Sequence, residues 1–150
     1  MTAPAVPDPD CPLCTAVGGA LVWQSERLRV IRADEPGFPA FYRVVWTQHV
    51  REFSDLSAAD SMLCMQVVTT VERVLREQLQ PTKINLAALG NMVAHLHWHV
   101  IARFDWDSHF PAAIWAPAQR PRDVLREQAV TARLAEFEPR LVAALQSVLK

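Results

Sequence analysis

The sequence predicts an α+β fold: a mostly antiparallel five-stranded sheet with a long helix packed on one face and a helical C-terminal extension. Three observations predict it. Short β-branched runs joined by short connections indicate antiparallel strands, residues 57–80 carry apolar side chains at helical spacing, and residues 123–149 form a second helical region. The length of 150 residues allows one domain with its own core.

The expected elements follow in chain order. Residues 20–24 and 27–33 form a hairpin, a loop over 34–39 carries two prolines and a glycine, and residues 41–47 form a third strand. The long helix begins near Ser57, which with Asp60 resembles a capping box, and ends at Pro81. Residues 83–89 and 95–104 supply two more strands, and the last helix is expected to break or kink near Pro139.

Composition excludes several classes of protein. The formal net charge of −1 gives no electrostatic reason to expect nucleic acid or an anionic membrane as partner. No apolar run reaches the roughly 18 residues that span a bilayer. Residues 1–9 contain proline and aspartate and lack the basic and apolar regions of a signal peptide, so we expect a cytoplasmic protein.

Three of the five histidines lie in the stretch His95-Leu96-His97-Trp98-His99. In a strand, alternate side chains share a face, so the three imidazoles would line one face about 6.6 Å apart, with the apolar residues on the other. Surface histidines are one interpretation, and a three-imidazole metal centre is another, although three ligands in line close poorly around a tetrahedral ion. The favoured interpretation is covalent catalysis, because a neutral imidazole is a competent nucleophile toward phosphorus.

The motif His-Leu-His-Trp-His-Val-Ile resembles that of the histidine triad family, and residues 44–56 and 84–93 resemble the family's segments around it. Residues 38–39, 89–91 and 103–115 resemble a bacterial subgroup of uncertain substrate. The resemblance implies a homodimer that binds a nucleotide substrate and hydrolyses or transfers nucleoside monophosphate groups. We expect residues 1–106 to form the histidine triad domain and residues 107–150 to form an aromatic loop and helical extension of the same domain.

The resemblance also implies roles for single residues. His97 matches the family's nucleophile, His99 the residue that contacts the phosphate and assists the leaving group, and Asn85 an asparagine near the nucleotide. Two positions differ from the family: Asn91 stands where it commonly has Gln, and Met92 where it has Ser or Thr. Two further contacts are expected, Asp34 with the ribose and Arg103, on the face of the histidines, with phosphate or solvent.

Cys11 and Cys14 form a Cys-x-x-Cys pair that is open to three interpretations: reduced buried thiols, a redox pair or a zinc site. Some triad proteins join such a pair to a mid-chain histidine and the first triad histidine, which here are His49 and His95. The resemblance therefore implies a structural zinc on these four residues, provided that sheet twist turns His95 away from the other two imidazoles, and no organic cofactor. Cys64 is expected in the helix core.

The aromatic stretch after the triad has two interpretations. In the first, His109 lies at the surface and most tryptophans are core or interface anchors; in the second, Trp106, Phe110 and Trp115 help close the active site across a dimer interface. Two functions remain open: an enzyme with a nucleotidyl-histidine intermediate, and a nucleotide- or zinc-binding regulatory protein with little turnover. Met92 in place of a hydroxyl residue keeps the second function open.

Overall fold

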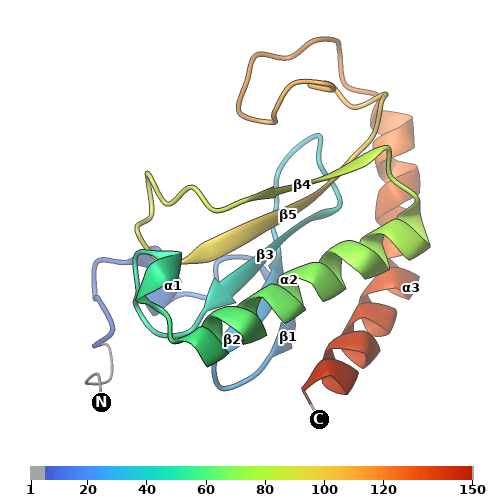
Figure 1. The fold of residues 1–150 in the computed structure, drawn as a ribbon. Helices are drawn as coiled ribbons and strands as arrows, with labels where there is room; N and C mark the ends of the chain where they lie inside the picture. The colour runs from blue at the N-terminus through green and yellow to red at the C-terminus, as the bar shows by residue number, and fades with distance from the viewer. Residues whose placement is uncertain (1–5, 150) are drawn as a thin grey trace.

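The computed structural model describes residues 6–149, so residues 1–5 of the expected domain 1–106 and residue 150 of its extension lie outside it. Its five-stranded sheet has the order β1-β2-β3-β5-β4, and every neighbouring pair is antiparallel. The strands are β1 (Ala20–Gln24), β2 (Leu28–Arg32), β3 (Phe41–Trp46), β4 (Lys83–Ala87) and β5 (His97–Arg103). The expected α+β fold is confirmed (Figure 1).

Two long helices cover one face of the sheet, α2 (Ala58–Leu79) and α3 (Val124–Val148), and two short ones are α1 (Pro12–Thr15) and the 3-10 turn Phe53–Asp55. The hydroxyl of Ser57 accepts a hydrogen bond from the Asp60 backbone N–H and caps α2. The Asp60 carboxylate pairs with Arg27, so it ties the helix start to the first hairpin. Gln80, at φ 50°, ends α2 in the left-handed conformation just before Pro81.

Of the break or kink expected near Pro139, the break is wrong, because α3 runs without interruption from Val124 to Val148. A proline removes one backbone donor and crowds the preceding turn. Buried side chains on both sides of it, Phe137 and Leu141 among them, hold α3 against the core. Tertiary packing therefore overrides the local preference for a break.

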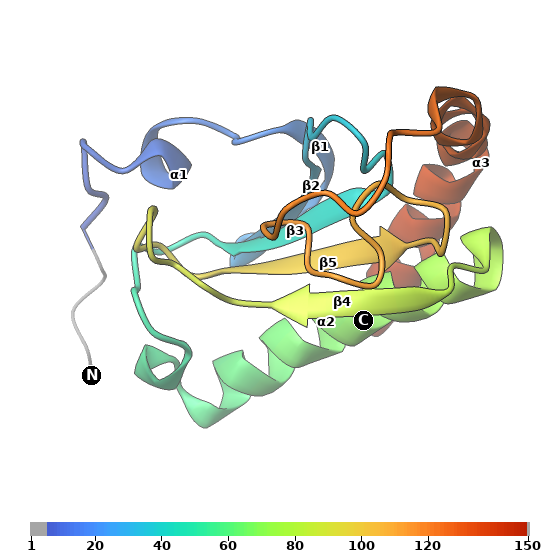
Figure 2. The same cartoon turned by 90° about the horizontal axis from the view of Figure 1, so that it is seen from above.

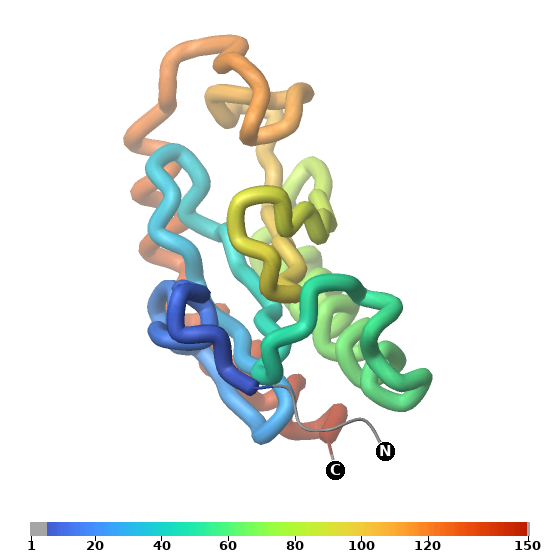
Figure 3. Tube along the Cα trace, turned by 90° about the vertical axis from the view of Figure 1, so that its left-hand side faces the viewer, coloured from blue at the N-terminus to red at the C-terminus, as the bar shows by residue number. Residues whose placement is uncertain are grey.

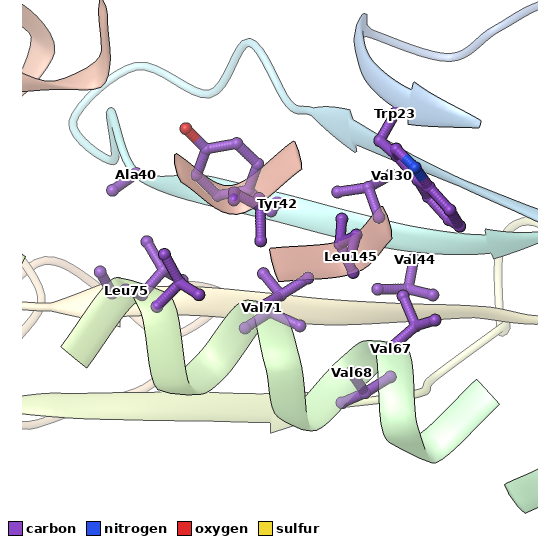
Figure 4. Close-up of a cluster of buried hydrophobic side chains, with 14 of the residues drawn as sticks. Trp23, Val30, Ala40, Tyr42, Val44, Val67, Val68, Val71, Leu75 and Leu145 are labelled. Atoms are coloured by element: carbon purple, nitrogen blue, oxygen red, sulfur yellow. The ribbon is translucent and has the colours of Figure 1, made fainter. Parts of the chain in front are cut away.

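The main core lies between the sheet and the two long helices. Alternate residues of each strand point into it, including Val30, Tyr42 and Val44, and they meet Val67, Val71 and Leu75 of α2 and Leu145 of α3 (Figure 4). None of the helices in the described part is both long and apolar enough to span a membrane.

The other face of the sheet carries no long helix. Residues 104–123, which connect β5 to α3, cross this face in an irregular loop on the side opposite α2 (Figure 2). Two smaller apolar clusters also lie on this face: Cys11, Leu13, Ile31 and Val45 form one, and Ala33, Phe38, Phe41 and Ile101 form the other. The face between these clusters holds the candidate site.

Candidate functional site

Strand β5 places its polar side chains on the face of the sheet that carries no long helix, here called the open face, because successive side chains alternate between the two faces. His97, His99 and Arg103 point there, whereas Val100 and Ala102 enter the core beneath α2 and α3. The antiparallel register sets Val45 opposite His97 and Arg43 opposite His99. The ring centroids of the two histidines lie 4.9 Å apart, so both imidazoles can contact one phosphoryl group.

His95 is turned away from the other two imidazoles and toward the cysteine pair, as its expected role as a metal ligand requires. The strand begins at His97, and the His95 ring is fully buried against the cysteine pair. The cause lies in the preceding chain, because the backbone of Leu96 bonds to both Trp46 and Val50. Those bonds hold the backbone where the His95 side chain points toward the N-terminal segment.

His97 is held in one tautomer by its own backbone. Its Nδ1 lies 2.6 Å from the carbonyl oxygen of His95, and because a carbonyl only accepts, Nδ1 must donate. The lone pair then sits on Nε2. Burial lowers the pKa of His97 and keeps the ring neutral near pH 7. A neutral imidazole with a free Nε2 is the form required of a nucleophile.

His99 lies among groups that all disfavour its protonation. Burial, followed by the nearby His97 and Arg43, lowers its pKa to about 4. The Arg43 Nε donates to Nδ1 of His99 at 3.3 Å. The rings of Phe41 and Trp115 stand edge-on to the imidazole at centroid distances of 5.5 and 5.3 Å.

Four potential metal ligands converge at one end of the sheet: Cys11, Cys14, His49 and His95, whose ligand atoms all lie within 4.8 Å of one another. Figure 3 looks onto this end, where the N-terminal segment, the segment after β3 and the segment before β5 lie side by side. Sγ of Cys14 is 3.3 Å from Nδ1 of His49 and 3.4 Å from Nδ1 of His95. Bonds of about 2.0–2.3 Å to a tetrahedral zinc place neighbouring ligand atoms about 3.3–3.8 Å apart, and the sulfur–nitrogen contacts of 3.3–3.4 Å match these separations. The donor set of two thiols and two imidazoles suits that ion.

The surroundings of the cluster also suit a metal. Nε2 of His95 lies 2.6 Å from the carbonyl oxygen of Trp46, and Nε2 of His49 lies 3.9 Å from the Asp8 carboxylate. Such outer partners hold metal-binding imidazoles in orientation. Without a cation, burial raises the pKa of the Cys14 thiol and lowers that of His95, so both groups stay neutral.

Arg29 supports this cluster and was not predicted. Its buried guanidinium donates to the carbonyl oxygens of Leu13, Ala16 and Val17, at 2.9, 3.1 and 3.0 Å. It therefore fastens α1 and the residues after it to β2. The available signal was a charged residue at an alternate position of an otherwise apolar strand.

Asn85 and Arg103 lie together, but they contact each other. Arg103 is 1% exposed. Its guanidinium donates hydrogen bonds to the Asn85 side-chain oxygen at 2.8 Å and to the Ala112 carbonyl oxygen at 2.7 Å, and it donates two more to the Asp107 carboxylate. The expectation of a solvated Arg103 is wrong, because the loop after β5 folds over the guanidinium. Asp107 also accepts from the backbone N–H groups of residues 104, 109 and 110, so this ion pair organises the loop.

The remaining expected contacts lie farther out. Asn91 and Met92 are exposed in the segment before β5, and Met92 lines a hollow beside Cys11 and His49. Asp34 is exposed and lines a cavity of about 570 Å³ between the β2–β3 loop and α3, together with Glu138. Within residues 6–149, no hydrogen bond joins any of these three side chains to His97 or His99.

The aromatic residues of the loop divide between the two faces. Trp115 packs on His99, whereas Phe110 lies over the Arg103 guanidinium, 5.8 Å from centroid to Cζ. Trp106 stacks on Phe104 and packs against the main core, as expected of most tryptophans here, so the alternative that it closes the site does not hold for this residue. His109 is half-buried against Phe38 and Ser108, not at the surface as expected.

Comparison with known proteins identifies the family. The model of the HIT domain, the histidine triad domain, matches residues 17–106, and the chain belongs to this family. No curated protein sequence matches the chain.

Solved structures show the same fold. A histidine triad protein from Bradyrhizobium japonicum is 26% identical, with a TM-score of 0.65 over 81% of this chain and 91% of that one. One from Marinobacter aquaeolei is 24% identical, with a TM-score of 0.65 over 83% and 92%. A zinc-bound histidine triad family protein from Mycobacterium smegmatis is 18% identical, with a TM-score of 0.58 over 87% and 97%.

The ion pair of Arg103 and Asp107 generates a prediction about stability. Burial alone would raise the pKa of the Asp107 carboxyl, but hydrogen bonds from Arg103 and from the loop backbone lower it below its ordinary 3.8. Asp107→Asn should cost about 3 kcal/mol of unfolding free energy at pH 7, because it leaves a buried guanidinium without its charge partner. Urea unfolding measures the loss, and Asp105→Asn, an exposed neighbour, should cost less than about 0.5 kcal/mol.

The same prediction has a pH dependence. A carboxyl with a lowered folded-state pKa stabilises the fold fully above about pH 4, and this contribution is lost as the pH falls. The difference between the wild type and Asp107→Asn should therefore be constant near neutrality and shrink below about pH 4. A constant difference down to pH 2 would contradict the assignment.

Proposed function

We propose that this protein is a nucleotidyl hydrolase or transferase that acts on a nucleoside phosphate ester, anhydride or phosphoramidate through a covalent intermediate on His97. The observation that carries the proposal is the 2.6 Å contact between Nδ1 of His97 and the carbonyl of His95, which leaves Nε2 as a free nucleophile on the open face. His99 lies beside it, 4.9 Å between ring centroids, where it contacts the same phosphoryl group.

The reaction has two steps. Nε2 of His97 attacks phosphorus, the N–P bond forms, and the bond to the leaving group breaks with its electron pair going to that group. Water or an acceptor alcohol then attacks the same phosphorus and loses its proton to solvent, while the N–P bond breaks and its electron pair returns to Nε2 of His97. The site supplies hydrogen-bond donors for the charge on the phosphoryl oxygens, which is the part of the transition state that most needs stabilisation.

Asp34 and Asn91 are the two exposed polar residues among the proposed contacts, and they lie beyond opposite ends of β5: Asp34 in the loop before β3, and Asn91 in the segment before His97. The proposed contacts with the nucleotide therefore come from both ends of the open face. Asn85 and Arg103 are proposed to affect nucleotide binding indirectly, because Arg103 bonds to both Asn85 and Ala112 and so holds the loop after β5 in place. The second candidate function is nucleotide or zinc binding with little turnover. It is favoured by Met92, 97% exposed, which offers no hydroxyl to a leaving group.

His97→Ala should abolish turnover and leave nucleotide binding largely intact, because loss of a covalent nucleophile removes the reaction path but few ground-state contacts. Adenosine phosphoramidates and diadenosine polyphosphates serve as test substrates, with binding measured by calorimetry on AMP. His109→Ala, whose imidazole bonds to Ser108, is the matched control and should keep its activity. A rate above ~10% of the wild type in His97→Ala would exclude covalent catalysis by this residue.

We also propose that Cys11, Cys14, His49 and His95 bind one structural zinc per chain. Two thiolates and two imidazoles form a closed tetrahedral shell with no open position, so the ion stabilises the fold and does not act on substrate. The zinc-bound relative from Mycobacterium smegmatis supports this proposal.

Elemental analysis of protein purified without chelators should find one zinc per chain. Cys14→Ala should lose most of it and lower the melting temperature by about 5 °C or more, since metal binding contributes directly to folding. Cys64→Ala is the control, because Cys64 is buried in the α2 core, away from the cluster. Wild-type protein without zinc, or a Cys14→Ala variant that retains it, would refute the assignment.

A homodimer is the remaining proposal. Strand β4 forms one edge of the sheet, and an unpaired edge presents backbone donors and acceptors to a second copy. Light scattering should give about twice the chain mass of 16.9 kDa. Leu86→Lys places a charge on this edge and should weaken the dimer, whereas Leu125→Lys on the exposed side of α3 should not. A wild-type protein that is monomeric at micromolar concentration would contradict the proposal.

A further inference from the structure

Arg43 occupies the centre of the open face and makes one side-chain hydrogen bond. The sheet register sets it opposite His99, and its Nε donates to Nδ1 of that ring at 3.3 Å. The guanidinium carbon lies 5.0 Å from the centre of the Phe41 ring, which supports it from one side. Within residues 6–149, its two terminal nitrogens have no hydrogen-bond or ion-pair partner.

The other two arginines on this face have structural partners. Arg29 is held by three backbone carbonyls, and Arg103 is held by Asp107, Asn85 and a carbonyl. Arg43 is half-buried. The negative charge of Glu35 acts on it through space, but the two side chains form no ion pair. A partly desolvated cation without an ion pair costs stability, so its contact with His99 is the feature that needs explanation.

The contact constrains the chemistry of His99. A guanidinium is a permanent donor with no acceptor atom, so the nitrogen that faces it must accept. We propose that Arg43 is a positioning residue that keeps Nδ1 of His99 free of a proton, so that the single ring proton of His99 sits on Nε2. The backbone carbonyl of His95 imposes the reverse arrangement on His97.

Two neighbouring imidazoles are thereby held in opposite tautomers. His97 presents a lone pair at Nε2, and His99 presents an N–H at Nε2. When the N–P bond forms, the His99 N–H donates a hydrogen bond to a phosphoryl or leaving-group oxygen and keeps its proton, because a neutral imidazole is a very weak acid. This catalytic consequence rests on the proposed function, but the tautomer itself does not.

The groups that face His99 can be named from each element packed against it. They are Arg43 and Phe41 on β3, His97 on β5, Ala87 on β4 and Trp115 in the loop. No carboxylate stands among them, so nothing on these elements would stabilise a proton on Nδ1. The pKa of His99, about 4, agrees with this geometry.

The test is the protonation of His99 Nδ1, read from nitrogen-15 shifts of histidine-labelled protein and assigned by single substitutions. At about pH 5, between the pKa of about 4 and the ordinary 6.5, the wild type should carry no proton on Nδ1. Arg43→Met, similar in length and without a donor, should gain that proton in a large fraction of molecules. Arg43→Lys, a donor without an acceptor, should restore the wild-type shifts.

Arg32→Met is the matched control, because Arg32 lies on the neighbouring strand β2 and pairs with Glu138 of α3. It should leave the His99 shifts unchanged, and unfolding curves verify that every variant is folded. A proton on Nδ1 in the wild type, or unchanged His99 shifts in Arg43→Met, would overturn the inference. So would a failure of Arg43→Lys to restore them.

Turnover gives a second readout. Arg43→Met should lower kcat about tenfold or more with KM changed only a few-fold. Without Arg43, His99 no longer keeps its proton on Nε2, and the N–H that donates in the transition state is lost. If the wild type turned over no nucleotide, the proposed function would fail while the shift measurement still decided the role of Arg43. If turnover were found and the shifts of Arg43→Met did not change, only the inference about Arg43 would fail.

Discussion

Successive side chains of β5 point to opposite faces of the sheet, and most of the molecule is arranged around that alternation. Val100 and Ala102 enter the core and anchor the strand beneath α2 and α3. The same anchoring fixes His97 and His99 on the other face with little freedom to move. A shift of one residue in register would bury both imidazoles and expose the apolar residues, so core packing itself positions the candidate site.

His95 connects the Cys2His2 cluster to this strand. Its ring lies between Cys11 and Cys14, and its carbonyl oxygen accepts from Nδ1 of His97. The orientation of one residue therefore bears on both sites. Arg29 and the Trp46 carbonyl hold the cluster from the β2 and β3 side, so the N-terminal segment, the sheet and His97 form one continuous unit.

Local patterns were sufficient to predict most of the fold. The strands and α2 follow from periodicity and from Ser57 and Pro81, which mark the helix ends. The four residues of the Cys2His2 cluster were predicted by resemblance to a known family, since they lie far apart in the sequence. Three features depend on contacts that no local pattern encodes: the unbroken course of α3 through Pro139, the burial of Arg103 under residues 104–123, and the backbone bonds of Leu96 that direct His95 toward the cysteine pair.

Arg43 shows why part of the site could not be predicted. The alternation of β3 places it on the face of Val45 and Phe41, but only the pairing of β3 with β5 brings it to His99. Its charge matters because Arg29 and Arg103 on the same face have their donors occupied. Within the described part of the chain, the terminal nitrogens of Arg43 are thus guanidinium donors that have no partner, and they lie beside two neutral imidazoles. A face of this kind attracts anionic ligands even though the chain as a whole carries a charge of −1.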